Sequence, residues 1–284
     1  MIMTHSIIRF IVCVIISIIC IIPVLIIVVN ATRLSGAITR NGFSLIPGNG
    51  LMKNWTTLTD EAAGPFSAVY NVWLGYRNSL VIAASCTVLS VLFSGLTAYG
   101  LTVYDFKLKK AATTFILAVM MVPMQVVSAG FIEFMLKIKW VDNYAPLILP
   151  AIAAPSVVFF MLQYMRSSFP LDIVEAARID GSGEMRTFVQ IALPILKPAF
   201  AVQAIFAFVA AWNNYYTPSI ILISNKMQRN PMSIMVSAVL ANDHNVDMGV
   251  QYLAIALSVL PVIIVYFFLS KFIVKGVALG AVKG

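Results

Sequence analysis

Six long apolar runs alternate with short polar segments along most of this chain. They lie at residues 7–29, 78–103, 111–136, 145–163, 198–223 and 250–274. A helix that spans a bilayer needs about 20 consecutive, mainly apolar residues. The first run is longer than the apolar core of a cleaved signal peptide, so we expect it to remain as the first helix. The pattern predicts an all-α polytopic membrane protein with six transmembrane helices.

The distribution of Lys and Arg predicts the orientation of these spans. Six spans place both termini on one side of the membrane, together with residues 164–197. That side carries 11 Lys and Arg residues and the opposite side carries 8. Because cytoplasmic segments hold an excess of Lys and Arg, we expect both termini and residues 164–197 to be cytoplasmic.

Composition narrows the classes of protein that the chain can belong to. Hydrophobic residues make up 61% and charged residues 11%, whereas soluble domains contain about 25% charged residues. The net charge is +8, but the cations flank the apolar runs, which indicates membrane anchoring and contact with lipid and not binding of nucleic acid. The three Cys residues lie within apolar runs, and neither His has a neighbour at metal-ligand spacing. We expect no metal site.

A charged, amphipathic stretch from Glu175 to Pro194 interrupts the apolar pattern. Before it, Ser168 is a candidate helix cap and Pro170 suits a first helical turn. Asp172 and Glu175 would then lie near the positive end of the helix dipole.

The same stretch predicts where this helix ends. Ile173, Ala176 and Ala177 are three or four residues apart and would form a narrow apolar face. Gly181 can take the left-handed conformation that ends a helix. With a second helix from Ser182 toward Pro194, the product is a helix-turn-helix elbow. An ordinary surface loop between two spans is the alternative.

Polar residues at mid-membrane mark the third and fifth runs. Pro123 and Gln125 lie near the middle of the third. In the fifth, residues 203, 207, 210, 214 and 217 share a helical face that includes Asn214 and Thr217, and Asn213 is adjacent. Such groups should face other helices or water. Hydrogen bonds between helices and the lining of a substrate path both account for them.

Glu133 is the one acidic residue inside a predicted span that suggests ion coupling. Lys137 follows four residues later, in the order that favours an ion pair on a helix. Both residues lie near the end of the span, so an interfacial ion pair is the preferred interpretation over a proton relay.

The elbow has the spacing of a known motif. Glu175-Ala176-Ala177, then Gly181 after three residues, and then Ile191 and Leu193-Pro194 resemble the EAA loop of ABC importer permeases. Residues 77–79, 121–123, 212–213 and 280–284 extend the likeness. From residue 77 onward the chain resembles the smaller, maltose-type permeases of bacterial carbohydrate importers. We therefore expect a first helix and outer loop over residues 1–76, and a permease core over 77–284 with a coupling loop at 168–197.

The resemblance implies a function and a set of partners. The chain would be the permease subunit of an ATP-driven importer of a sugar or oligosaccharide in the bacterial inner membrane. Its partners would be a second homologous permease, two ATPase subunits and an extracellular solute-binding protein. No G-x-x-x-x-G-K-[ST] loop is present, so ATP and Mg²⁺ would bind the partner subunits, and this chain would hold no cofactor and be no enzyme.

The resemblance also assigns residues to roles. The expected ATPase-coupling residues are Asp172, Glu175, Ala176, Ala177, Asp180 and Gly181. The C-terminal residues Lys283 and Gly284 would reach toward the ATPase subunits. Gln125, Asn213, Asn214 and Thr217 are candidates for the substrate path.

Three alternatives remain at the level of the sequence. A permease of this kind can carry a different solute, such as glycerol phosphate. An ion-coupled secondary transporter would also have kinked helices and polar groups at mid-membrane, but it should carry a carboxylate deep in the membrane. A membrane scaffold would explain the packing features and leave the elbow spacing unexplained.

Overall fold

All regular secondary structure in the described residues of the computed structural model is helical. The structure describes residues 2–60, 62, 65–224, 226–242 and 246–281. Within them, five helical segments are long and apolar enough to cross a membrane. The prediction of an all-α polytopic membrane protein is confirmed. The helices divide into two compact units, residues 1–76 with 230–261 and residues 77–229 with 262–284.

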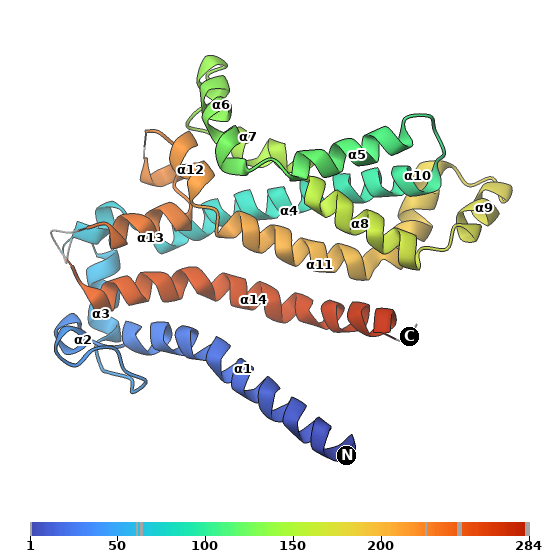
Figure 1. Cartoon of the computed structure of the whole chain (residues 1–284). Coiled ribbons are helices and arrows are strands. Elements are labelled where there is room, and N and C mark those ends of the chain that lie inside the picture. Colours follow the sequence, from blue (N-terminus) through green and yellow to red (C-terminus); the bar gives the residue numbers. More distant parts are fainter. Residues whose placement is uncertain (1, 61, 63–64, 225, 243–245, 282–284) are drawn as a thin grey trace. The chain divides into compact units, whose positions relative to one another are not determined.

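The first unit contains the N-terminal helix and the polar segment that follows it (Figure 1). Its complete helices are α1 (Ile2–Ala31), α2 (Ser35–Asn41), α3 (Leu51–Thr59), η1 (Pro65–Ala68) and α13 (Met232–Leu240). The first residues of α4 (Val72–Val103) and of α14 (Met248–Ala281) also belong to it.

Two buried asparagines fold the polar segment of the first unit. Asn54 on α3 donates from Nδ2 to the carbonyls of Ala31 and Arg33, both at 2.9 Å. Asn30 at the end of α1 donates to the Ser44 carbonyl at 3.0 Å and accepts the Ser44 N–H at 3.1 Å. Because buried amides stabilise a fold only when they are bonded, these contacts order a segment that lacks a long apolar run.

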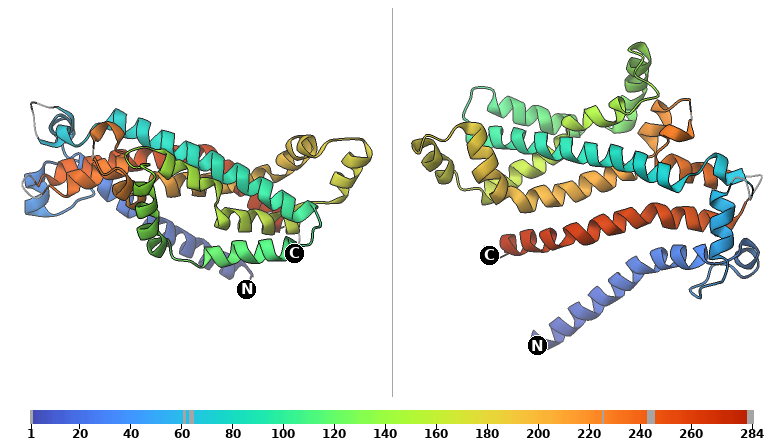
Figure 2. Two further views of the ribbon diagram at one scale, coloured as in Figure 1. Left: turned by 90° about the horizontal axis from the view of Figure 1, so that it is seen from above. Right: turned by 180° about the vertical axis from the view of Figure 1, so that it is seen from behind.

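The second unit contains the remaining elements. These are α5 (Lys109–Met120), α6 (Met124–Lys137), α7 (Ala145–Ile148), η2 (Leu149–Ile152), α8 (Pro155–Ser168), α9 (Asp172–Ile179), α10 (Glu184–Thr187), the π-helical turn η3 (Phe188–Ala192), α11 (Leu193–Trp212), α12 (Tyr216–Ile221) and η4 (Met227–Arg229). In Figures 1 and 2, α4, α8 and α11 run side by side, with α9 near one end of this group and α6 and α12 near the other.

A hydrophobic core lies between α4, α8 and α11 and extends to α9. Ala98 and Tyr99 of α4, Met161 of α8 and Leu196 of α11 are buried in it. Val174 of α9 belongs to the same core. The short helix α9 is therefore packed onto the long helices by its own apolar side chain.

Three predicted spans are interrupted helices. The fourth predicted span consists of α7, η2 and α8, with Ala153 and Ala154 between η2 and α8. The third predicted span consists of α5 and α6, because Pro123 stands at the N-cap of α6 in an extended conformation (φ −63°, ψ 129°). Proline lacks an N–H and disfavours the helical conformation in the residue before it. The fifth predicted span likewise stops at Trp212 and resumes as α12 at Tyr216.

Gly95 and Gly100 of α4 provide a matched test of helix packing. A Cβ added at Gly95 would meet Cζ of Phe200 on α11, whereas one added at Gly100 has no neighbour within 4 Å. Alanine in place of a helical glycine stabilises by roughly 1 kcal/mol, and overpacking destabilises by about 1–3 kcal/mol. We expect Gly100→Ala to raise the thermal unfolding temperature in detergent and Gly95→Ala to lower it relative to Gly100→Ala. Phe200→Leu should restore the Gly95→Ala variant. Equal unfolding temperatures for the two alanine variants would contradict this packing.

Candidate functional site

The first helix of the predicted elbow is the eight-residue helix α9. It begins at Asp172, and its N-cap is Leu171 without a side-chain hydrogen bond, so the predicted cap at Ser168 is wrong. Asp172 and Glu175 both lie in its first turn, where the helix dipole favours negative charge.

Gly181 ends α9 in the left-handed conformation, with φ +76°. The Gly181 N–H donates to the Arg178 carbonyl at 3.0 Å, and the Ser182 N–H donates to the Ala177 carbonyl at 2.9 Å. These two bonds are the Schellman motif, which satisfies the last carbonyls of a helix. The predicted role of Gly181 in the backbone is confirmed. A Cβ at this position would have open space around it, so the backbone angle alone selects glycine.

The faces of α9 differ in part from the prediction. Val174 and Ala177 are buried within the chain, at 1% and 6% exposure. Ala177 therefore packs α9 onto its own unit and is not on an outer apolar face with Ile173 and Ala176. The outward side consists of exposed residues, namely Asp172, Ile173, Glu175, Ala176, Ile179 and Asp180.

The second helix of the elbow continues into the membrane-spanning helix. It begins at Glu184, passes through the π-helical turn η3 and becomes α11 without ending near Pro194. Pro194 lies in the first turn of α11. Because proline cannot donate to the carbonyl four residues before it, a wider turn directly before Pro194 accommodates the missing hydrogen bond. The elbow and α11 thus form one helical segment without a break from residue 184 to residue 212, which bends at the π-helical turn (Figures 1 and 2).

Three side chains join the elbow to the end of α4. Glu184 accepts a hydrogen bond from Arg178 Nε at 2.8 Å on one carboxylate oxygen and from the Tyr104 hydroxyl at 2.6 Å on the other. The Arg178 guanidinium carbon lies 5.5 Å from the centre of the Tyr104 ring. Partial burial and the bond to the Glu184 carboxylate raise the pKa of the Tyr104 phenol, so it is protonated and donates at neutral pH. We call these residues the Tyr104–Arg178–Glu184 cluster.

Sequence reasoning missed this cluster. Tyr104 precedes Glu184 by 80 residues, and no local pattern links them. The one signal in the sequence is the six-residue spacing of Arg178 and Glu184 across a helix-ending glycine, which a turn can bring together.

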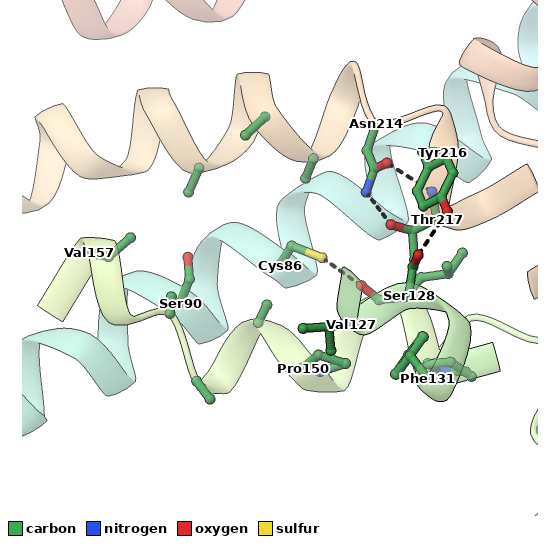
Figure 3. A pocket seen from close by; sticks show the side chains of 18 of the residues that line it. Cys86, Ser90, Val127, Ser128, Phe131, Pro150, Val157, Asn214, Tyr216 and Thr217 are labelled. Carbon is green, nitrogen blue, oxygen red and sulfur yellow. Dashed lines mark hydrogen bonds between the residues drawn. The ribbon is translucent and has the colours of Figure 1, made fainter. Parts of the chain in front are cut away.

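A pocket of about 460 Å³ lies at the other end of the second unit (Figure 3). Small and apolar residues from α4, α6, α7, η2, α8, α11 and α12 form most of its wall. The lining residues are Cys86, Ser90, Val127, Ser128, Phe131, Pro146, Leu147, Pro150, Ala151, Ala153, Ala154, Val157, Ala207, Ala210, Ala211, Asn214, Tyr216, Thr217 and Ile220.

Polar groups in the pocket wall bond to one another at the break between α11 and α12. Asn214 donates from Nδ2 to Thr217 Oγ1 and accepts the Thr217 N–H, both at 3.2 Å. The Ser128 and Tyr216 hydroxyls are 2.8 Å apart (Figure 3). The amide of Asn214 thus binds the first turn of α12, and Tyr216 ties that turn to α6.

The pocket contains only part of the predicted substrate path. Asn214 and Thr217 line it together with Ala207 and Ala210. Because the helix stops at Trp212 and resumes at Tyr216, these residues do not share the single helical face that was predicted. Gln203 is buried and lies outside the lining set, and Asn213 is exposed and also lies outside it. The side chain of Gln125 and the tail residues Lys283 and Gly284 lie outside the described part of the structure.

The charged residues outside the elbow correct a second prediction. Over the residues that the structure describes, the one ion pair is Arg178–Glu184, so the predicted Glu133–Lys137 pair is not formed. In the same part of the chain, no three His, Cys, Asp or Glu residues gather where they could hold a metal ion.

Known proteins resemble this chain over most of its length. Residues 90–279 match the family described as binding-protein-dependent transport system inner membrane component. The arabinooligosaccharides transport system permease protein AraQ of Halalkalibacterium halodurans is 32% identical over 271 residues, which cover 95% of this chain and 93% of AraQ. The sn-glycerol-3-phosphate transport system permease protein UgpE of Salmonella typhimurium is 29% identical, with 89% of each chain covered.

A solved structure shares the fold. A chain from the crystal structure of a bacterial ABC transporter involved in the import of the acidic polysaccharide alginate superposes with a TM-score of 0.76. It is 21% identical, and the match covers 94% of this chain and 96% of that chain. The elbow spacing, the helical fold and the match over most of the sequence agree, and this chain belongs to the family of binding-protein-dependent transport system inner membrane components.

Proposed function

We propose that this chain is the permease subunit of an ATP-driven ABC importer that carries a sugar or oligosaccharide across the membrane. The observation that carries the proposal is the EAA spacing on an exposed helix. Glu175 and Ala176 face outward on α9, and Gly181 fixes the end of that helix. The chain transports and does no bond chemistry, and it is coupled to separate ATPase subunits through this elbow.

The partners follow from the family. An extracellular solute-binding protein delivers the solute, and two ATPase subunits supply the free energy and hold ATP and Mg²⁺. The second permease is a homologous chain, so that the membrane part is a heterodimer. The coupling residues on the outward side of the elbow are Asp172, Glu175, Ala176 and Asp180, while Ala177 and Gly181 set the position of that surface.

The pocket favours a neutral solute over a phosphate ester. The residues that line it offer hydroxyl and amide groups and two aromatic rings, and none of these described lining residues is charged. A phosphate dianion is held in proteins by Arg, Lys or groups of backbone N–H donors. Carbohydrate is therefore the first candidate, and glycerol phosphate, the solute named for a relative, is the second.

Coupling can be tested at Gly181, with Gly183 as the matched control. Gly183 has an ordinary extended backbone (φ −70°) and open space for a side chain. Val at position 181 would be forced into the left-handed region at about 1–2 kcal/mol, which misdirects the elbow. We expect Gly181→Val and Glu175→Lys to insert normally, with ATPase subunits that are weakly held or that hydrolyse ATP regardless of solute.

The measurement combines a pull-down of the ATPase subunit with solute-stimulated ATPase activity in proteoliposomes. Gly183→Val should behave as the unmodified protein in both assays. Full recovery of the complex and full stimulation in both Gly181→Val and Glu175→Lys would refute the coupling role.

The substrate path can be tested at Asn214, with the neighbouring Asn213 as control. Asn214→Leu removes the amide from the pocket wall, whereas Asn213→Leu changes an exposed residue outside it. In the Asn214→Leu variant, uptake of arabinotriose, maltotetraose and sn-glycerol 3-phosphate should fall, or the preference among these three solutes should change. Unchanged uptake of all three, with lower stability alone, would assign Asn214 to packing.

We propose a membrane topology with both termini and residues 164–197 in the cytoplasm of a bacterial cell. In a variant without Cys13, Cys20 and Cys86, a single Cys at Asn49 should react with an impermeant maleimide added outside intact cells. A single Cys at Ser182 should react only after the membrane is opened. The reverse pattern would invert the orientation.

A further inference from the structure

The Tyr104–Arg178–Glu184 cluster is a closed triangle of side chains from three separate segments. Tyr104 follows the last residue of α4, Arg178 lies in the last turn of α9, and Glu184 is the first residue of α10. Each side chain contacts both of the others, through the ion pair, the hydrogen bond and the cation–π contact given above.

The cluster fixes the direction of α9 relative to its neighbours. Both oxygens of the Glu184 carboxylate are occupied by donors from different segments. The Arg178 guanidinium is held at its edge by the carboxylate and at its face by the aromatic ring. Because hydrogen bonds and ring contacts of this kind depend on direction, a rotation of α9 about the Gly181 turn would break them together.

Tyr104 is in turn fastened to the end of α4. Lys109 Nζ donates to the Tyr104 carbonyl at 2.8 Å and to the Thr102 carbonyl at 3.4 Å, two acceptors at the end of that helix. The Tyr104 ring lies edge-on to Tyr99, with 6.4 Å between ring centres, and Tyr99 lies 5.2 Å from the ring of Phe188. A displacement of Tyr104 is therefore transmitted to buried residues of α4.

The α4 helix reaches the pocket. Cys86 and Ser90, on the same helix as Tyr99, line it. An α-helix with intact hydrogen bonds moves as a nearly rigid rod, rising about 1.5 Å per residue. The end of α4 at the elbow and the part of α4 at the pocket thus belong to one rigid element.

We propose that the Tyr104–Arg178–Glu184 cluster is a positioning latch that makes α4 follow the movement of the coupling helix α9. The continuous helical segment of residues 184–212 already connects the elbow to α11 through the chain itself. The latch adds a second, non-covalent route, so that α4 and α11 move together. This inference rests on the proposed function, because it assigns a role within ATP coupling.

The side chains of the latch are partly exposed to solvent, which distinguishes the proposed role in coupling from a role in the stability of the fold. The Arg178 and Glu184 side chains are 37% and 45% exposed, and exposed ion pairs contribute little to the free energy of unfolding. Variants of the latch should therefore fold, insert and retain the ATPase subunits. Their defect should be in the number of solute molecules transported per ATP hydrolysed.

The test uses the whole complex in proteoliposomes, with its second permease, ATPase subunits and solute-binding protein. Glu184→Ala, Arg178→Ala and Tyr104→Phe should each lower the transport of arabinotriose, maltotetraose or sn-glycerol 3-phosphate per ATP by at least about fivefold, the lower range of measured couplings between sites. Tyr104→Phe keeps the ring and removes only the hydroxyl. If the latch acts as a unit, the double variant Glu184→Ala with Tyr104→Phe should be no worse than Glu184→Ala alone.

Arg186→Ala is the matched control. Arg186 has the same charge as Arg178 and lies in the same elbow. Its Nε, however, donates to Gln190 Oε1 at 2.9 Å within its own helical segment. This variant should keep the coupling ratio of the unmodified complex.

The outcomes distinguish this inference from the proposed function. Unchanged coupling ratios in the three single variants, or additive losses in the double variant, would overturn the latch and leave the proposed function standing. Loss of the ATPase subunits from these variants would also overturn it, because the residues would then be docking contacts. If the unmodified complex transports none of the probes, the stimulation of its ATPase activity by the solute-binding protein is measured instead. Equal stimulation in the unmodified complex and in the three single variants would then overturn the latch. If that stimulation is also absent, the proposed function fails, and the latch with it.

Discussion

The absence of water inside a bilayer is the constraint on which this structure depends. Every backbone N–H and C=O in hydrocarbon needs a partner within the protein, so the spans are helices, and a helix can stop at that depth only where other groups replace its hydrogen bonds. The interruptions in the third and fifth predicted spans obey this rule differently. At Pro123 the chain has no N–H to satisfy. At residues 213–215 the Asn214 amide supplies both a donor and an acceptor to Thr217, at the start of α12.

The second interruption is also where the wall of the pocket becomes polar. Asn214 and Thr217 belong to it directly, and Tyr216 brings the Ser128 hydroxyl of α6 into the same group. A helix break thus converts a face of small apolar residues on α11, such as Ala207 and Ala210, into a wall that carries hydroxyl and amide groups. The apolar part of the wall allows close packing, and the polar end supplies the pocket with hydrogen-bonding groups.

Features that depend on local sequence were predictable, and features that depend on contacts between distant residues were not. The apolar runs predicted the helices, and the spacing from Glu175 to Gly181 predicted the elbow and its left-handed glycine, because one residue type fits that backbone angle. Helical periodicity placed Asn214 and Thr217 on one face of a continuous helix, whereas both line the pocket at a break in that helix. The interruption at Pro123 was visible as a proline, but not the division of the run into two helices. Glu184 meets Tyr104 across 80 residues, and Asn54 meets the Ala31 carbonyl across 23, and no periodic pattern specifies either contact.

The position of Ala177 shows why the elbow is both attached and exposed. In the coupling role that we propose for it, α9 must present one face to a partner, but a short helix is not stable alone and has to bury its other face. Val174 and Ala177 meet this need by packing inward, which leaves Glu175 and Ala176 outside. The turn at Gly181 then directs the chain into the helical segment of residues 184–212, and the Tyr104–Arg178–Glu184 cluster connects the same turn to α4. Both long helices contribute to one pocket, which Ser90 lines from the middle of α4 and Asn214 from just beyond the end of α11. A displacement of α9 that is transmitted to both helices would therefore move two walls of the pocket together. A displacement of α11 alone would move only one wall relative to the other.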